Sequence, residues 1–258
     1  MTHNIVFLFF NGGGLSEKQW YNHPFKGQKF WLERNKENYK SKLIKKIKKI
    51  GDIHIDTPSF YLKNKAIKIS DLNLTKHCNE LYDKIKNYDK IFIISHSRGH
   101  ILSKFFCQLY YKKIIGYINI DGGESNDWHR IKLKEWKQKY NYINDNELNK
   151  LFNKNDEKSY DIISRFIKYN MYKQNFKNKY DFKNINMLIL NNIYNDSETS
   201  ISSEQYIKET LMSKFNFNKQ FETMKNVKSI YYVGKTHYLY FYDDVIDDII
   251  DYINKLIK

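Results

Sequence analysis

Ser97 is the residue whose surroundings most clearly suggest chemistry. It stands at the centre of Ser95-His-Ser-Arg-Gly99, between a short apolar segment and a longer amphipathic one. A serine hydroxyl is a weak nucleophile until a neighbouring base takes its proton, and that base in turn needs an acid to orient it. The chain contains eight histidines, so the base has to be chosen by its place in the fold and not by residue type alone.

The segments on either side of Ser97 predict a strand followed by a helix. Ile91 to Ile94 is a continuous apolar run rich in β-branched residues, which is typical of a strand buried on both faces of a parallel sheet. From His100 to about Lys112, apolar residues recur at helical spacing. Ser97 is therefore expected on a tight strand-to-helix turn, where the residues two before and two after it must be small. Ser95 and Gly99 meet this requirement.

This arrangement, small-x-Ser-x-small between a strand and a helix, resembles the nucleophile elbow of the α/β-hydrolase family. The usual first small residue is Gly, and this chain has Ser95 there; many members also carry a second Gly where this chain has His100. The resemblance implies an α/β fold with a mostly parallel sheet flanked by helices. It also implies a serine hydrolase of the esterase and lipase type, which cleaves an ester or thioester through an acyl-enzyme without a metal or organic cofactor.

A glycine-rich loop, Asn11-Gly-Gly-Gly14, follows the first predicted strand, Ile5 to Phe10. In the family the corresponding strand ends in His-Gly-x, and its loop supplies a backbone N–H to the oxyanion hole. By this resemblance the backbone N–H groups of Gly13 and Arg98 form the hole. Asn11 in place of His leaves the donor intact, because the donor is main chain. A phosphate-binding loop is disfavoured, because no Lys-Ser or Lys-Thr pair follows the glycines.

The family order of catalytic residues is Ser, then Asp or Glu, then His. By this order the resemblance implies a triad of Ser97, Asp196 and His237. His237 is the only histidine after the final predicted strand, Ser229 to Val233. Asp196 is the first acid after the predicted strand Met187 to Leu190.

Two other acids stay open as alternatives to Asp196. Glu198 lies in the same loop and has the longer reach, and Asp121 follows the preceding predicted strand, where some hydrolases carry the acid. Asp121 has a structural interpretation as well, as a strand-end residue that caps the following glycine turn. His96 and His100 flank Ser97 and are interpreted as pocket or packing residues.

The remaining patterns predict alternating strands and helices with right-handed crossovers. Further strands are predicted at Asp52–Asp56 and Gly116–Ile120, and further helices at Lys40–Ile50, from Ser70 or Asn73 to about Tyr88, at Ser203–Lys214 and at Asp243–Ile257. Between Glu124 and Lys183 only helices are predicted, at Asp127–Tyr140, Asp145–Phe152 and Asp156–Tyr172. We expect a core domain of residues 1–121 and 184–258 and a helical lid at 122–183. The alternative is that these helices cover the sheet without a gating role.

Composition limits the other possibilities. The 258 residues carry 41% hydrophobic residues and 17% aromatic residues, as expected of a globular domain and not of a disordered chain. No apolar run approaches the roughly 20 residues that span a bilayer. Cys78 and Cys107 fall on apolar helix positions, which indicates reduced core residues and favours a cytoplasmic location.

The net charge of +15 has two interpretations. It could attract an anionic partner, including weak contact of the lysine-rich Lys40–Ile50 face with a membrane surface. It is also what an AT-rich coding sequence would produce, and the lysines are spread along the chain. No specific nucleic-acid motif is present. The expected partner is a small-molecule acyl substrate, and the sequence leaves the oligomeric state and the choice between hydrolase and acyltransferase open. The main alternative function is a catalytically silent α/β-hydrolase-like binding protein.

Overall fold

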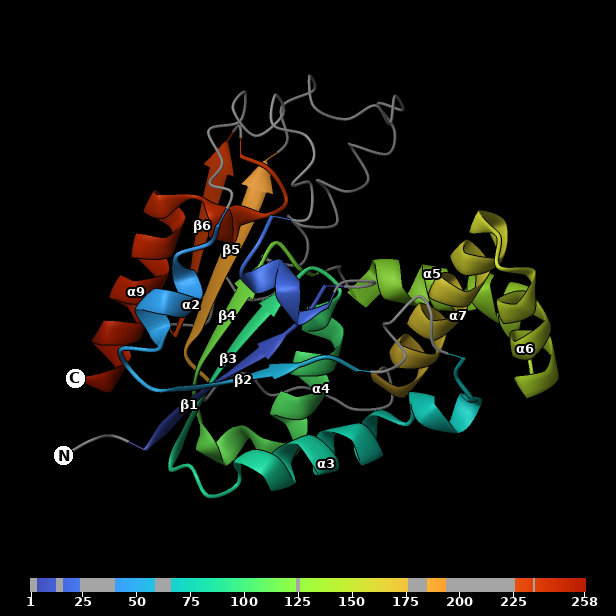
Figure 1. Cartoon of the computed structure of the whole chain (residues 1–258), viewed down its shortest axis with the longest axis horizontal. Coiled ribbons are helices and arrows are strands. Elements are labelled where there is room, and N and C mark those ends of the chain that lie inside the picture. The colour runs from blue at the N-terminus through green and yellow to red at the C-terminus, as the bar shows by residue number, and fades with distance from the viewer. Residues whose placement is uncertain are drawn as a thin grey trace.

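Six parallel strands form one sheet in the order β2-β1-β3-β4-β5-β6 (Figure 1). The computed structural model describes residues 4–12, 16–23, 40–58, 66–123, 126–175, 185–193, 226–233 and 235–258, with the side chains of 126–130, 175, 193 and 233 left aside. The strands are β1 (Ile5–Phe10), β2 (Asp52–Asp56), β3 (Lys90–His96), β4 (Ile114–Ile120), β5 (Met187–Ile193) and β6 (Val227–Val233). The predicted α/β class and parallel sheet are therefore confirmed.

The central strands are buried on both faces, which explains their uninterrupted apolar sequences. In β1, alternate residues Val6 and Leu8 belong to one hydrophobic core, and Phe7 and Phe9 belong to a second core on the other face. The side-chain period of two in a strand separates them in this way. Helices must therefore cover both faces of the sheet, as in other parallel α/β proteins.

The helices divide between these two faces. On one face lie α3 (Leu74–Ile85) and α4 (Gly99–Tyr110), and on the other lie α2 (Leu43–Ile47) and α9 (Asp243–Ile257), as Figure 1 shows. Four short 3-10 helices are also described: η1 (Glu17–Trp20), η3 (Ile69–Leu72), η4 (Tyr111–Lys113) and η5 (Leu239–Phe241). The predicted helix Lys40–Ile50 is shorter than expected, and the predicted helix Ser203–Lys214 lies outside the described residues.

The lysine-rich face of α2 is partly used within the molecule. Lys42 Nζ lies 2.7 Å from a carboxylate oxygen of Asp243, and Lys46 contacts Asp247. These pairs tie α2 to α9 at an exposed surface, where each contributes little to stability. Within the described ranges, no helix combines the length and apolarity needed to cross a bilayer.

Three helices are inserted between β4 and β5: α5 (Asn126–Tyr140), α6 (Asp145–Lys154) and α7 (Glu157–Asn175). They occupy most of the region predicted as a lid, and Figure 1 shows them to one side of the sheet, beyond α4. Their buried residues, such as Trp136, Leu148 and Phe166, belong to the same hydrophobic core as α3 and α4. The insert therefore completes the packing of this face, and its role as a lid stays a prediction.

The order of the strands indicates where along the carboxyl ends of the sheet a binding site is expected. The chain runs from β1 outward to β2, then returns to the other side of β1 with β3 and continues through β4, β5 and β6. In open parallel sheets, ligands bind beyond the carboxyl ends of the strands where the order reverses in this way. Here that position lies between the ends of β1 and β3, next to Asn11 and Ser97.

Candidate active site

Ser97 occupies the predicted tight turn between β3 and α4. Its φ angle is 50°, in the left-handed region that non-glycine residues rarely adopt. Its backbone N–H donates to the Ile120 carbonyl at 3.0 Å, and its own carbonyl accepts from the His100 backbone N–H at 3.2 Å and from His100 Nδ1 at 2.9 Å. The turn is thus held by its neighbours in a conformation that it would not favour alone.

Two glycines allow the strand ends to approach this turn. A Cβ atom at Gly99 would lie 2.4 Å from the Phe10 carbonyl oxygen and 2.6 Å from that of Asn11. A Cβ atom at Gly122 would lie 2.6 Å from the Ser97 carbonyl oxygen. Backbone groups cannot move aside as a flexible side chain would, so these positions exclude larger residues for a steric reason.

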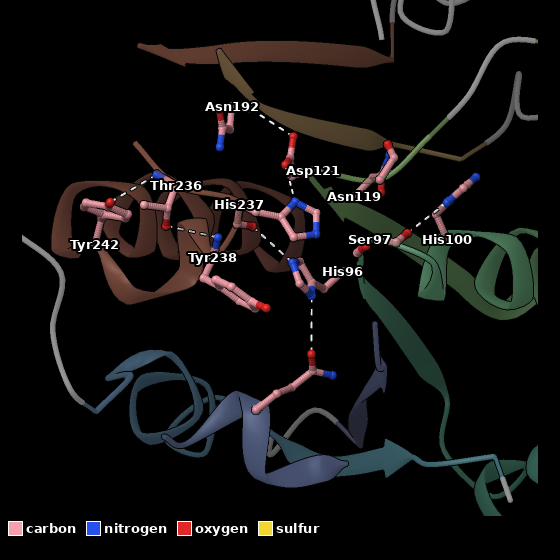
Figure 2. Close-up of polar contacts among 12 residues, drawn as sticks. His96, Ser97, His100, Asn119, Asp121, Asn192, Thr236, His237, Tyr238 and Tyr242 are labelled. Carbon is pink, nitrogen blue, oxygen red and sulfur yellow. Dashed lines mark hydrogen bonds and ion pairs between the residues drawn. The ribbon is translucent and has the colours of Figure 1, made fainter. Parts of the chain in front are cut away.

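His237 and Asp121 form a hydrogen-bonded pair beside the turn (Figure 2). Nδ1 of His237 lies 2.5 Å from Oδ2 of Asp121, and Oδ1 of the same carboxylate accepts from the Asn192 backbone N–H at 3.1 Å. The Asp121 side chain is fully buried, whereas that of His237 is 29% exposed. A buried carboxylate with both oxygens occupied holds the imidazole in one orientation, with Nε2 left as the basic nitrogen.

The carboxylate that pairs with His237 is the third of the three candidate acids. The sequence analysis placed Asp196 first, Glu198 second and Asp121 third; Asp196 and Glu198 lie outside the described residues. Nδ1 of His237 has one hydrogen to donate, and Asp121 accepts it. The physical reason lies in the sheet order: β4 is the immediate neighbour of β3, so its first residue after the strand lies beside the Ser97 turn.

The loop that carries His237 is fixed to the start of α9. The Thr236 backbone N–H donates to the Tyr242 hydroxyl at 3.1 Å, and the Tyr238 backbone N–H donates to the Thr236 hydroxyl at 3.3 Å, as Figure 2 shows. Lys235 lies over the Tyr242 ring, 4.4 Å from its centroid, and pairs with Asp244 at 2.8 Å. These contacts on both sides limit the positions that the His237 ring can take.

Figure 2 shows Ser97 beside the His237 ring, away from the ring nitrogen that meets Asp121. Among the described contacts, no hydrogen bond joins the Ser97 side chain directly to His237. Catalytic hydrogen bonds are often long without substrate and shorten in the reactive complex. A missing direct hydrogen bond is therefore compatible with Ser97 as nucleophile and His237 as base.

Of the two predicted oxyanion donors, the structure describes one. Arg98 is the N-cap of α4, and within the described contacts its backbone N–H has no acceptor, as expected at a helix N-terminus. Its side chain donates from Nη1 to the Ser164 hydroxyl on α7 at 3.0 Å. Gly13 lies outside the described residues.

Ser95, where the family usually has Gly, uses its hydroxyl in a buried polar cluster. It shares a hydrogen bond of 3.1 Å with the Tyr117 hydroxyl and donates to Asn119 Oδ1 at 3.3 Å. Tyr117 also bonds to Ser103 at 3.0 Å, and Asn119 Nδ2 donates to the Gly122 carbonyl at 2.5 Å. The cluster thus links the strand before Ser97 to the turn after Asp121. The sequence alone did not predict this cluster, because its members come from separate elements.

His96, interpreted from the sequence as a pocket or packing residue, makes polar contacts at both ring nitrogens. Its ring is fully buried; Nε2 lies 3.1 Å from the His237 carbonyl oxygen and Nδ1 lies 3.3 Å from Oε1 of Gln19. The His96 and His237 ring centroids are 4.5 Å apart.

His100 has a different set of contacts, since its ring binds the Ser97 carbonyl and closes the turn. Among the described residues, no three His, Cys, Asp or Glu side chains gather as metal ligands would.

No family model matches the sequence, and no curated protein matches it either. The structure, however, is similar to solved structures over nearly its whole length. A carboxylesterase structure from the thaumarchaeon Nitrososphaera gargenis has a TM-score of 0.50 and 10% identity, covering 99% of this chain and 92% of that chain. Smu.1393c from Streptococcus mutans has a TM-score of 0.50 and 14% identity, covering 98% and 89%.

A third similar structure, an α/β hydrolase fold protein from Nakamurella multipartita, has a TM-score of 0.47 and 7% identity, covering 99% of this chain and 93% of that chain. Together with the sheet topology, the matches at a TM-score of 0.50 show that this chain has the α/β-hydrolase fold. At such identities the likeness concerns the fold, so the function must be argued from the site.

The buried cluster behind Ser97 predicts an unusual dependence of stability on pH. Burial raises the pKa of Tyr117 well above its ordinary value near 10. A raised pKa in the folded state means that the stability from the neutral phenol is complete below pH 10 and is lost as pH rises further. Tyr117→Phe should cost about 1 kcal/mol at pH 8, through the lost hydrogen bonds. Above pH 10 the unchanged protein should lose up to about 1.4 kcal/mol per pH unit relative to the variant, so the difference should vanish and then change sign by about pH 11.

Urea denaturation at pH 8, 10 and 11 measures this difference. The matched control is Tyr142→Phe, because Tyr142 is 67% exposed. Its effect should be small at every pH. A Tyr117→Phe difference that stays constant from pH 8 to 11 would contradict the account of Tyr117 as a buried neutral phenol.

Proposed function

We propose that this protein is a serine hydrolase that cleaves a carboxylic ester or thioester, with Ser97 as nucleophile, His237 as base and Asp121 as the acid that orients the base. The observation that carries the proposal is the hydrogen bond between the buried Asp121 carboxylate and His237, beside a serine held at positive φ. A strained serine turn and an oriented imidazole each have structural explanations, but their presence at the same strand ends favours catalysis.

In the first half of the reaction, Ser97 Oγ attacks the acyl carbonyl carbon while His237 Nε2 takes the hydroxyl proton. The new bond pushes one electron pair onto the carbonyl oxygen. Asp121 stabilises the resulting imidazolium through Nδ1 and stays ionised. The tetrahedral intermediate then collapses, and the alcohol or thiol leaves with the proton from His237, so that an acyl-serine ester remains.

In the second half, a water molecule attacks this ester while His237 Nε2 takes its proton. Collapse releases the carboxylic acid and returns the proton to Ser97 Oγ. The backbone N–H of Arg98 supports the oxyanion in both halves, aided by the N-terminus of α4. By resemblance, the second donor is the backbone N–H of Gly13.

The insert α5–α7 is the part of the chain that we propose to shape substrate choice, as a cap over the site. The contact that supports this role is the hydrogen bond from the Arg98 side chain to Ser164, because it joins α7 to the residue next to the nucleophile. We also propose a small-molecule acyl substrate and a reducing compartment such as the cytoplasm. The proposal of a reducing compartment rests on Cys78 and Cys107, which are free and buried.

Replacement of the nucleophile is the first test. Ser97→Ala should reduce ester turnover by about 10⁶-fold and abolish labelling by a fluorophosphonate probe, because no other group can form the acyl bond. Ser70→Ala, at an exposed position, is the matched control and should label like the unchanged protein. Absence of labelling in the unchanged, folded protein would favour the alternative of a catalytically silent binding protein.

The choice of acid is tested by paired amide substitutions. Asp121→Asn should reduce turnover by about 10⁴-fold, because an amide cannot stabilise the imidazolium or hold the correct tautomer. Asp196→Asn is the matched substitution and should leave turnover nearly unchanged. The measurement is kcat for a reactive ester, with circular dichroism as a check on folding. A larger loss for Asp196→Asn than for Asp121→Asn would return the role to Asp196.

The cap role predicts a change in selectivity without a loss of the nucleophile. Ser164→Leu removes the partner of Arg98 and adds bulk on the face of α7 toward the elbow. It should alter the ranking of kcat/KM across acyl esters of graded chain length, while Ser97 still reacts with a small fluorophosphonate. Lys158→Leu, at an exposed position of the same helix, serves as control. An unchanged ranking in a folded Ser164→Leu variant would show that α7 only covers the sheet.

A further inference from the structure

The contacts of His96 connect the strand that carries the nucleophile to the loop that carries the base. His96 is the last residue of β3 and directly precedes Ser97. Its ring nitrogen Nε2 lies 3.1 Å from the backbone carbonyl oxygen of His237, across 141 positions of sequence. One residue therefore leads through its backbone to Ser97 and reaches through its side chain to His237, as Figure 2 shows.

The second ring nitrogen has a partner in Gln19, and the two contacts together determine the protons on the ring. Oε1 of Gln19 faces Nδ1 at 3.3 Å, and carbonyl oxygens only accept hydrogen bonds. With acceptors at both nitrogens, His96 would have to donate from both and carry a positive charge. That charge would be fully buried, and it would lie 4.5 Å from the ring of His237, which itself becomes positive during the proposed reaction.

Rotation of the Gln19 side-chain amide removes the need for a buried positive charge on His96. The side-chain amide of Gln19 keeps its shape when rotated by 180° about its last bond, so that Nε2 faces His96. In the first orientation Gln19 Nε2 is buried and has no hydrogen-bond partner. The rotation gives Nε2 a partner in His96 and places Oε1 in the position that Nε2 leaves. The contact that favours the first orientation is weak, since the Tyr240 hydroxyl lies 3.5 Å from Oε1. Gln19 then donates to Nδ1 of His96, and Nε2–H of His96 donates to the His237 carbonyl.

We infer that His96, kept neutral with its proton on Nε2 by Gln19, is a positioning residue that fixes the backbone of His237 relative to Ser97. This role rests on the proposed hydrolase function, although the hydrogen bonds can be tested without it. His96 does not contact reacting atoms; it acts through the position of His237.

The packing around His96 makes this arrangement rigid. Its ring meets Trp20 edge to face at 6.2 Å and Tyr240 edge to face at 5.0 Å, and lies 5.5 Å from the ring of Tyr238. Trp20 is itself held by a hydrogen bond from Nε1 to Asn11 Oδ1 at 2.6 Å, at the end of β1. Aromatic neighbours on several sides restrict the ring, so the hydrogen bond to His237 has little freedom to lengthen.

Two matched substitutions separate the hydrogen bond from the packing. His96→Phe keeps a ring among the aromatic neighbours and removes the donor, whereas His96→Gln places an amide N–H near the position of Nε2. His96→Phe should lower kcat by about 10²-fold, as expected for a misplaced catalytic group, with KM nearly unchanged. His96→Gln should recover most of that loss. Thermal melting of each variant reports whether packing alone has changed.

Nuclear magnetic resonance gives a test that does not depend on activity. Long-range ¹H–¹⁵N spectra of the imidazoles at pH 7 should show His96 as the neutral tautomer with its proton on Nε2. The ¹³C shift of the His237 carbonyl should move in His96→Phe and stay near its normal value in His96→Gln.

The outcomes distinguish this inference from the proposed function. A proton on Nδ1, protons on both nitrogens, or a folded His96→Phe variant with normal kcat would overturn the positioning role while leaving the hydrolase intact. If the unchanged protein fails to react with a fluorophosphonate, the hydrolase is excluded. The tautomer and the His237 carbonyl shift would then decide whether His96 holds this loop at all.

Discussion

The close packing of three strand ends around Ser97 is the constraint on which the rest of the site depends. The backbone of Gly99 packs closely against the end of β1. The backbone of Gly122, just beyond β4, packs closely against the carbonyl of Ser97. The Ser97 N–H is bound to the last residue of β4. A serine at φ 50° is unfavourable by itself, and the backbone contacts on both sides of the turn hold it there.

This packing also explains why the carboxylate that pairs with His237 follows β4. In a parallel sheet the carboxyl ends of neighbouring strands meet at the same edge, and β4 is adjacent to β3. Asp121 follows β4 directly and also has a positive φ, 46°, which turns the chain at once beside the serine turn. Its carboxylate receives the Asn192 N–H from β5 on one oxygen and His237 on the other. Three neighbouring strands thus fix a single carboxylate before any substrate is present.

Buried polar groups, and not only apolar packing, specify this region. Ser95, Tyr117 and Asn119 form a cluster on one side of the turn, and His96 and Gln19 form a second contact chain on the other. Polar groups in a buried site must find partners, so each permits few alternative arrangements. The departure of Ser95 from the usual Gly is an example: its hydroxyl would be unfavourable there without Tyr117 and Asn119.

The sequence by itself determined the sheet, the serine turn and the histidine. Continuous apolar runs identified β1 and β3, because strands buried on both faces are mostly apolar. β4 was identified by a similar run that Gly116 and the buried Asn119 interrupt. The small residues at 95 and 99 located Ser97, since the steric demand of that turn is local. His237 was found by its place between the last strand and α9.

Only the tertiary structure decided which acid meets that histidine. Asp121, Asp196 and Glu198 all follow strands, and sequence order ranks them without measuring distance. The choice depends on which strands are neighbours and on where the loop after β6 returns, and both are long-range properties of the fold. The same holds for His96 and Gln19, whose contact spans 77 positions and has no local signature.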